Sequence, residues 1–104
     1  MAASLTVIIP AYNEVESIGD TLAALSDQTS PPEAIIVVDD GSTDGTADVA
    51  RRFDGVTVLS PGANLGSKAK AQNYALDFCS TDLVLPVDAD TVLASGYVEL
   101  LKEP

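Results

Sequence analysis

The fold is decided by residues 83–90, LVLPVDAD, where a run of apolar residues ends abruptly at two acids, Asp88 and Asp90. The same pattern occurs at residues 34–40, AIIVVDD. Short apolar runs of this kind are typical of buried parallel strands, and ligands of open α/β sheets bind beyond the carboxyl ends of such strands. The two acidic strand ends therefore predict one shared polar site.

Strands and helices are predicted to alternate along the whole chain. The second helix is expected to be capped by Ser42 or Thr43. Short connections in such an alternation imply right-handed crossovers and a mostly parallel sheet. The strand order 3-2-1-4 would bring the polar strand ends together, so we predict a Rossmann-like α/β fold with that order. The strands are expected at residues 5–10, 34–38, 56–59 and 83–87, and a helix is expected after each of them.

Composition limits both the class of protein and its partners. The 104 residues, 46% of them hydrophobic, predict a single globular domain over 1–104. Sixteen acidic residues against five basic ones give a net charge of -11. This charge disfavours nucleic acid as a partner, because like charges repel. A phosphate-bearing ligand would need a divalent cation, Mg²⁺ or Mn²⁺, held by the surplus carboxylates.

Several classes of catalytic site are excluded by the residue types present. Histidine is absent, so the chain has no Ser/His/Asp or Cys/His set. The single cysteine, Cys79, is expected to be a small buried residue of the third helix, and it fits a reducing, cytoplasmic compartment. No stretch approaches the ~20 apolar residues of a membrane-spanning helix.

Asp88 and Asp90 are the candidate metal ligands. Side chains alternate along an extended chain, so both carboxylates can face one ligand while Ala89 points elsewhere. One carboxylate would hold the cation, and phosphate oxygens and water would fill the remaining positions. The alternative is that both acids are solvated turn residues.

Two other groups of residues suit a nucleotide. Asp40 could hydrogen-bond loop amides and cap a helix, while Asp39 could accept from a ring N–H of a nucleobase. Lys68 and Lys70 stand at the start of a helix, where the dipole disfavours positive charge unless an anion binds nearby. They could also be ordinary solvated lysines. Tyr12 could stack on a base or simply cover the edge of the core.

Four segments, in this order, resemble the family 2 glycosyltransferases of GT-A fold. They are VIIPAYNE at 7–14, VVDDGSTD at 37–44, KAKAQNYAL at 68–76 and DAD at 88–90. The resemblance covers almost the whole chain. It implies the nucleotide-diphosphate-sugar-binding half of a GT-A domain, in an enzyme that transfers a glycosyl group with inversion to an acceptor that the sequence does not identify.

The resemblance also implies roles for individual residues. Asp39 would bind the base, Lys68 the nucleotide, and Asp88 the ribose or sugar. Asp90, in the DXD motif with Asp88, would ligate the metal that bridges the diphosphate. The residues implied to bind the donor are Ala11, Tyr12, Glu14, Asp39, Lys68, Asp88 and Ala89.

No residue of this chain is assigned as catalytic, because the general base of the family is expected beyond the DXD motif. We therefore expect the chain to bind a nucleotide weakly with metal and to transfer no sugar. An uncovered sheet edge and apolar surface would favour self-association. The parent enzyme could lie at the inner face of a membrane.

Two other functions remain open from the sequence. Residues 85–91, LPVDADT, also resemble the nucleophile strand of haloacid-dehalogenase phosphatases, in which Asp88 would attack phosphorus and Asp90 would act as acid and base. That strand usually comes first in such enzymes, whereas here it comes last. The other alternative is a non-catalytic module that binds a nucleotide sugar without turnover.

Overall fold

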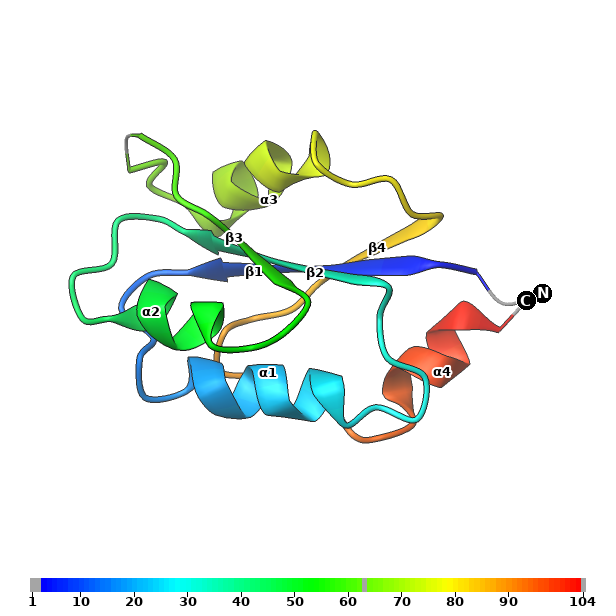
Figure 1. Ribbon diagram of the computed structural model, residues 1–104. Helices are drawn as coiled ribbons and strands as arrows, with labels where there is room; N and C mark the ends of the chain where they lie inside the picture. The colour runs from blue at the N-terminus through cyan, green and yellow to red at the C-terminus, as the bar shows by residue number, and fades with distance from the viewer. Residues whose placement is uncertain (1–2, 63, 104) are drawn as a thin grey trace.

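Each apolar run found in the sequence forms a strand, and a helix follows each strand. The computed structural model describes residues 3–62 and 64–103, and within them four strands alternate with four helices (Figure 1). The predicted alternation is confirmed. The elements are β1 (Leu5–Ala11), α1 (Ile18–Ser26), β2 (Ala34–Asp39), α2 (Thr46–Arg51), β3 (Val56–Leu59), α3 (Lys68–Leu76), β4 (Leu83–Pro86) and α4 (Tyr97–Lys102).

The strands form one parallel sheet in the order β3-β2-β1-β4, as predicted. In β1, Val7 lies opposite Ile35 of β2 on one side and Leu85 of β4 on the other. Every residue of β1 is buried, because helices cover both faces of the strand. The carboxyl ends of β2, β1 and β4 consequently meet at one edge of the sheet.

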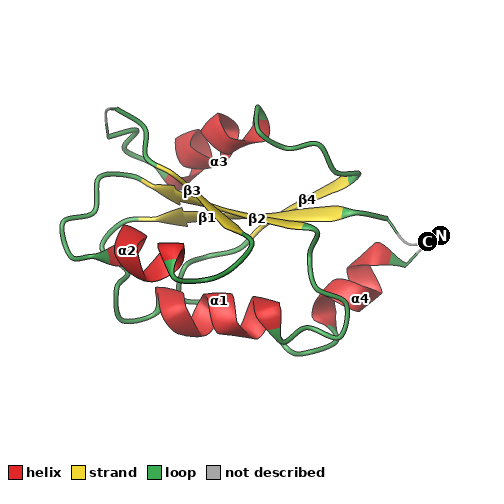
Figure 2. Cartoon of the chain, in the orientation of Figure 1, coloured by secondary structure: helices red, strands yellow, loops and turns green. Residues whose placement is uncertain are grey.

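Helices α1, α2 and α4 lie on one face of the sheet and α3 on the other (Figure 2). The larger core cluster joins Val7 and Ile9 of β1 to Leu22 of α1 and to Val98 of α4. Ile8 belongs to a smaller cluster, with Ala71 and Ala75 of α3 among its members. Neighbouring residues of β1 thus face different layers, as the alternation of side chains along a strand requires.

Two local expectations were wrong. Gly45, and not Ser42 or Thr43, is the N-cap residue of α2, and its φ of 91° is a left-handed conformation that glycine adopts freely. The third predicted helix ends earlier than expected, so Cys79 lies beyond α3 and is only half-buried. It packs against the smaller core cluster without being part of its buried interior.

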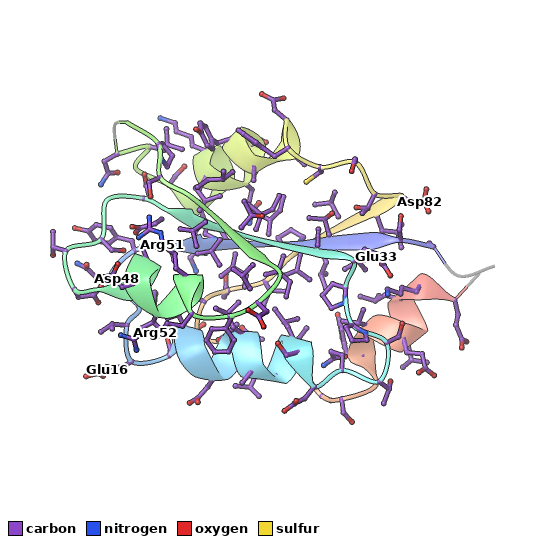
Figure 3. The ribbon with its side chains drawn as sticks, viewed as in Figure 1. Glu16, Glu33, Asp48, Arg51, Arg52 and Asp82 are labelled. Atoms are coloured by element: carbon purple, nitrogen blue, oxygen red, sulfur yellow. The ribbon has the colours of Figure 1, made fainter. Side chains whose placement is uncertain are left out.

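Charged side chains surround the core. Figure 3 shows Arg51 and Arg52 at α2, and the Arg51 guanidinium lies 3.3 Å from the Asp48 carboxylate. Glu33 and Asp82 lie toward the amino ends of β2 and β4. Among the described residues, no helix is both long enough and apolar enough to cross a membrane.

Candidate functional site

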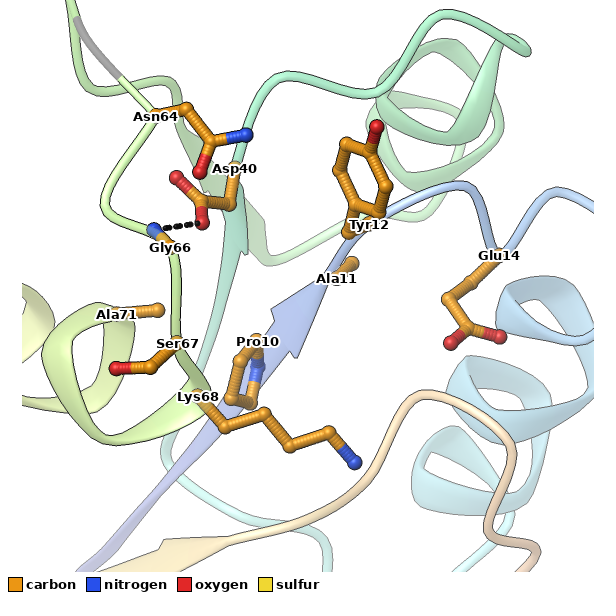
Figure 4. A pocket seen from close by; sticks show the side chains of 10 residues that line it. All are labelled: Pro10, Ala11, Tyr12, Glu14, Asp40, Asn64, Gly66, Ser67, Lys68 and Ala71. Atoms are coloured by element: carbon orange, nitrogen blue, oxygen red, sulfur yellow. Dashed lines mark hydrogen bonds between the residues drawn. The ribbon is translucent and has the colours of Figure 1, made fainter.

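A cavity of about 400 Å³ lies at the carboxyl end of β1, beside the start of α3 (Figure 4). Three separate parts of the chain form it: the end of β1 with the loop after it, the residue that follows β2, and the loop before α3 with the first turn of that helix. Four of the residues expected to bind a nucleotide sugar line it together. The lining residues are Pro10, Ala11, Tyr12, Glu14, Asp40, Asn64, Gly66, Ser67, Lys68 and Ala71.

Tyr12 and Ala11 contribute to the apolar part of this cavity, together with Pro10 and Ala71. Ala11 is buried at the last position of β1, whereas the side chain of Tyr12 is 54% exposed. In Figure 4 the Tyr12 ring rises beside the cavity, with Asp40 on one side and Glu14 on the other. An exposed aromatic ring at a cavity rim can stack on a planar ligand.

Asp40, and not Asp39, is the acid of this pair that lines the cavity. Asp39 is the last residue of β2, and its carboxylate accepts a hydrogen bond from the backbone N–H of Ser42 at 3.1 Å. Its side chain is therefore held by the turn that follows the strand. The base-binding role expected for Asp39 consequently fits the position of Asp40.

The carboxylate of Asp40 also organises the loop before α3. It accepts hydrogen bonds from the backbone N–H groups of Leu65 at 2.6 Å and Gly66 at 3.1 Å. The hydroxyl of Ser67 then accepts from the N–H of Lys70, which starts the helix at Lys68. Asp40 thus hydrogen-bonds loop amides, as the sequence suggested, and it fixes the point from which the Lys68 side chain extends.

Lys68 extends along the cavity toward β4 (Figure 4). Its ammonium group donates to Asp88 Oδ1 at 3.0 Å. This hydrogen bond, with the nearby charges of Asp88, Asp90 and Glu14, raises the pKa of Lys68. Both partners of the pair are more than half exposed, and exposed pairs contribute only about 0–1 kcal/mol. The ammonium is therefore free to bind another anion at little cost.

Asp88 and Asp90 reach the same edge of the sheet but line different hollows. Asp90 borders a hollow shared with Glu14 and Asp44, and Asp88 borders another beside Tyr97. The predicted extended arrangement was wrong here, because β4 ends at Pro86 and the chain turns, with the N–H of Thr91 donating to the carbonyl of Asp88 at 3.1 Å.

Ala89 faces neither the cavity nor these hollows among the described residues. It is 3% exposed and belongs to the larger core cluster. The hydroxyl of Thr21, in α1, lies 2.8 Å from the Ala89 carbonyl oxygen. The Ala89 side chain is thus part of the core, and its expected role in donor binding stays a prediction.

The loops after β1 and β2 are tied to each other. Asn13, at a positive φ of 53°, donates its N–H to the Ser42 hydroxyl at 2.8 Å, and its side-chain oxygen accepts from the N–H of Thr43 at 2.9 Å. The N–H of Glu14 donates to the hydroxyl of Thr46 at 2.9 Å. These bonds fix the backbone of Asn13 and Glu14 and thereby position Tyr12 and Glu14, which both line the cavity.

Asp44 supports the same arrangement. Its carboxylate accepts from the hydroxyl and the N–H of Thr46 and from the N–H of Val15. Hydrogen bonding to Thr46, above all to its hydroxyl, holds the pKa of Asp44 below its usual value. The short polar residues of the VVDDGSTD segment thus serve chiefly to brace the loops that carry the site.

Sequence reasoning gave no role to Pro10, Ser67 and Ala71, which line the cavity, or to Thr21. It predicted base binding by Asp39, whereas the acid that lines the cavity is Asp40. A signal for Thr21 was present, since it is a polar residue at the spacing of the apolar face formed by Ile18, Leu22 and Leu25. Among the described residues, no group of three or more His, Cys, Asp or Glu side chains is arranged to hold a metal ion by itself.

Comparison with known proteins identifies the family. Residues 6–104 match the sequence profile described as Glycosyl transferase family 2. The chain belongs to this family. Its sheet order and flanking helices are those of a Rossmann-like GT-A fragment, which confirms the resemblance noted from the four sequence segments.

Curated relatives from two bacteria illustrate this family 2 membership. The chain is 32% identical over 97 residues to a poly(ribitol-phosphate) beta-glucosyltransferase of Bacillus spizizenii, covering 88% of this chain and 15% of the relative. It is 40% identical over 103 residues to a 4,4'-diaponeurosporenoate glycosyltransferase of Staphylococcus aureus, covering 94% of this chain and 27% of the relative. The chain thus spans only a fraction of the length of these glycosyltransferases.

Solved structures of other proteins match the fold closely. The mannosyltransferase PcManGT of Pyrobaculum calidifontis, in complex with GDP-Man and Mn²⁺, superposes with a TM-score of 0.85 at 31% identity, over 100% of this chain and 34% of that one. Staphylococcus aureus TarS 1-349, in complex with UDP, superposes with a TM-score of 0.88 at 29% identity, over 94% of this chain and 30% of that one. This family 2 chain corresponds to the N-terminal, nucleotide-binding portion of such proteins.

Proposed function

We propose that this chain binds a nucleotide-diphosphate sugar together with Mg²⁺ or Mn²⁺, as the donor-binding region of an inverting glycosyltransferase. The observation that carries the proposal is the meeting of Tyr12, Asp40 and Lys68 in one cavity. An aromatic ring, a carboxylate and an ammonium group suit, respectively, the face of a base, its ring N–H and a phosphate.

Asp40 can serve a ligand as well as the protein. Its two oxygens already accept from Leu65 and Gly66, but an ionised carboxylate offers about four lone-pair positions. A base N–H could therefore bind without breaking either loop contact. The free lone pairs of Asp40 are a further reason for proposing Asp40, in place of Asp39, as the residue that accepts a hydrogen bond from the base.

The acids at the end of β4 fit a divalent cation that arrives with its own ligands. The Lys68 ammonium is a cation that already lies beside Asp88. The negative charge of Asp90 also raises the pKa of Lys68. With Asp88 and Asp90 as its protein ligands, the cation would take its other ligands from diphosphate oxygens and water. When bound, the metal would neutralise charge on the leaving nucleoside diphosphate, while Lys68 is free to contact the phosphates.

The named relatives agree with this ligand class. PcManGT is described in complex with GDP-Man and Mn²⁺, and TarS in complex with UDP. We extend to this chain only the shared chemistry, a nucleoside diphosphate carrying a sugar.

Calorimetric titration of the chain with UDP, GDP and their sugars, each with and without Mn²⁺, tests the proposal. We expect one base to be preferred and binding to tighten with Mn²⁺. Asp40→Asn should weaken binding of the preferred nucleotide by roughly tenfold whether or not metal is present, since one ligand hydrogen bond to a charged group is lost. Asp90→Asn should remove most of the gain from Mn²⁺.

Asp54→Asn is the matched control, because Asp54 is an exposed acid between α2 and β3, away from the lining residues of the cavity. It removes the same charge and should leave every affinity unchanged. Equal losses in Asp54→Asn and Asp90→Asn would mean that net charge alone governs binding. Binding that ignores Mn²⁺ and both site substitutions would overturn the proposal.

A further inference from the structure

The buried face of α1 contains one hydroxyl group among its apolar side chains. Thr21 is 1% exposed and lies in line with Ile18, Leu22 and Leu25. Its hydroxyl is 2.8 Å from the carbonyl oxygen of Ala89, the residue between the two acids of the DXD motif. The contact joins a residue of the first helix to one that lies 68 positions later in the chain.

This contact is more than ordinary helix packing. The Thr21 hydroxyl also lies 3.2 Å from the carbonyl of Ser17, the N-cap residue of α1. A threonine in a helix can bond the carbonyl four residues earlier, but the contact with Ala89 is the shorter of the two and joins two different elements. Because Ala89 is 3% exposed, its carbonyl has little access to water and depends on this hydroxyl.

We propose that Thr21 is a positioning residue for the metal-binding acids. Its hydrogen bond fixes the direction of the Ala89 carbonyl, and the peptide that carries this carbonyl is planar, so the amide of Asp90 is fixed with it. Thr21 thereby restrains the backbone from which the Asp90 carboxylate extends. This inference rests on the proposed function, since it assigns Thr21 to the metal-dependent part of donor binding.

Helix α1 is well placed to set the distance between the two sides of the Asp90 hollow. Its first turn is anchored by Glu14, whose carbonyl accepts from the N–H groups of Ser17 at 3.1 Å and Ile18 at 2.9 Å. Glu14 and Asp90 line that hollow together. One short stretch of helix thus connects to Glu14 at its start and, through Thr21, to the turn that carries Asp90.

The experiment compares Thr21→Val, which replaces the hydroxyl with a methyl group, with Thr21→Ser, which keeps the hydroxyl. Titration with the preferred nucleotide should show that Thr21→Val weakens binding in the presence of Mn²⁺ by roughly 5- to 30-fold, as expected for one buried hydrogen bond. Binding without metal should not change. Thr21→Ser should recover most of the Mn²⁺-dependent affinity, although it lacks the methyl group.

Thr6 provides a matched control at the opposite end of the sheet. It is also 1% exposed, and its hydroxyl lies 2.6 Å from that of Thr81. Thr6→Val should lower the midpoint of denaturant unfolding about as much as Thr21→Val, but without any loss of affinity. An equal loss of Mn²⁺-dependent affinity in both valine variants would show a general effect of stability and would overturn the inference.

Amide hydrogen exchange tests the positioning role without any ligand. The N–H of Thr91, which donates to the Asp88 carbonyl, should exchange at least severalfold faster in Thr21→Val and at the wild-type rate in Thr6→Val. Unchanged exchange, or faster exchange with unaltered Mn²⁺-dependent binding, would overturn the role of Thr21. A wild-type chain that binds no nucleotide would instead overturn the proposed function, and exchange at Thr91 alone would then decide whether Thr21 orders the turn.

Discussion

Lys68 carries a charge that its own helix disfavours. It is the first residue of α3, where the helix dipole is positive, and a cation there costs about 0.3–1 kcal/mol. The exposed ion pair with Asp88 stabilises the fold by a similar free energy, so the two effects nearly cancel. We therefore expect Lys68 to contribute to the binding of an anion and to have little effect on the stability of the fold.

Lys68→Met should weaken nucleotide binding by roughly tenfold while changing the free energy of unfolding by less than about 0.5 kcal/mol. The matched control is Lys70→Met, which removes the same charge from the same helical turn. Lys70 has no ion pair within the described part of the chain and does not line the cavity. Titration and denaturant unfolding of both variants check the prediction, and equal affinities for the two would contradict it.

The choice between Asp39 and Asp40 shows what residue types can and cannot predict. That two acids follow β2 is evident from the sequence, and so is their place at the edge of the sheet. The sequence does not predict which of the two acids lines the cavity. The strand β2 is buried on both faces, so its apolar residues do not alternate with polar ones in a way that would mark one face. The deciding contacts, from Leu65 and Gly66 to Asp40, join segments 25 and 26 residues apart.

At the level of the elements, the strands were predicted better than the turns that carry the site. The bounds of β3 matched residues 56–59, and β4 differed only at its last residue. Strand positions follow from local apolar runs, whereas the turn at Asp88 and the start of α2 depend on backbone hydrogen bonds and on the positive φ of Gly45. The residues near the site that lie on these turns, Asp88 and Asp90 among them, could therefore be placed at the edge of the sheet from the sequence, but their local backbone geometry could not.

Gln28 joins α1 to the segment between the DXD motif and α4. It is 4% exposed, its side-chain nitrogen donates to the Ala94 carbonyl at 2.7 Å, and its side-chain oxygen accepts from the N–H of Val98 at 3.0 Å. Gln28→Leu keeps a side chain of similar length but leaves both backbone groups without this partner. We expect it to lower the free energy of unfolding by roughly 2–4 kcal/mol.

Denaturant unfolding measures this loss, and Gln72→Leu is the control. Gln72 is the other glutamine of the chain, it lies in α3, and its side chain makes no hydrogen bond within residues 3–62 and 64–103. Gln72→Leu should change stability by less than about 0.5 kcal/mol. A Gln28→Leu protein as stable as Gln72→Leu would show that α4 does not depend on this amide.

At the scale of the whole molecule, the sheet has a partly exposed apolar edge strand in β4. The β4 edge pairs with β1 on one side only, and Leu83 and Val84 of this strand are each 38% exposed. Leu100 of α4 is 74% exposed. An apolar strand with an unpaired side is a template for pairing with another chain. Opposing this, the net charge of -11 keeps copies of the chain apart at low salt.

These opposing effects predict self-association that increases with salt. Sedimentation velocity at high protein concentration should show monomer at low ionic strength and a growing dimer fraction as salt shortens the Debye length to about 3 Å near 1 M. Val84→Lys should suppress the dimer, since a lysine on an edge strand blocks pairing. Thr57→Lys places the same charge at an exposed position of β3, the other edge strand, and should leave the dimer. If both variants remove it equally, reduced negative charge or a different surface is responsible, and a monomer at every salt concentration would rule out association through β4 altogether.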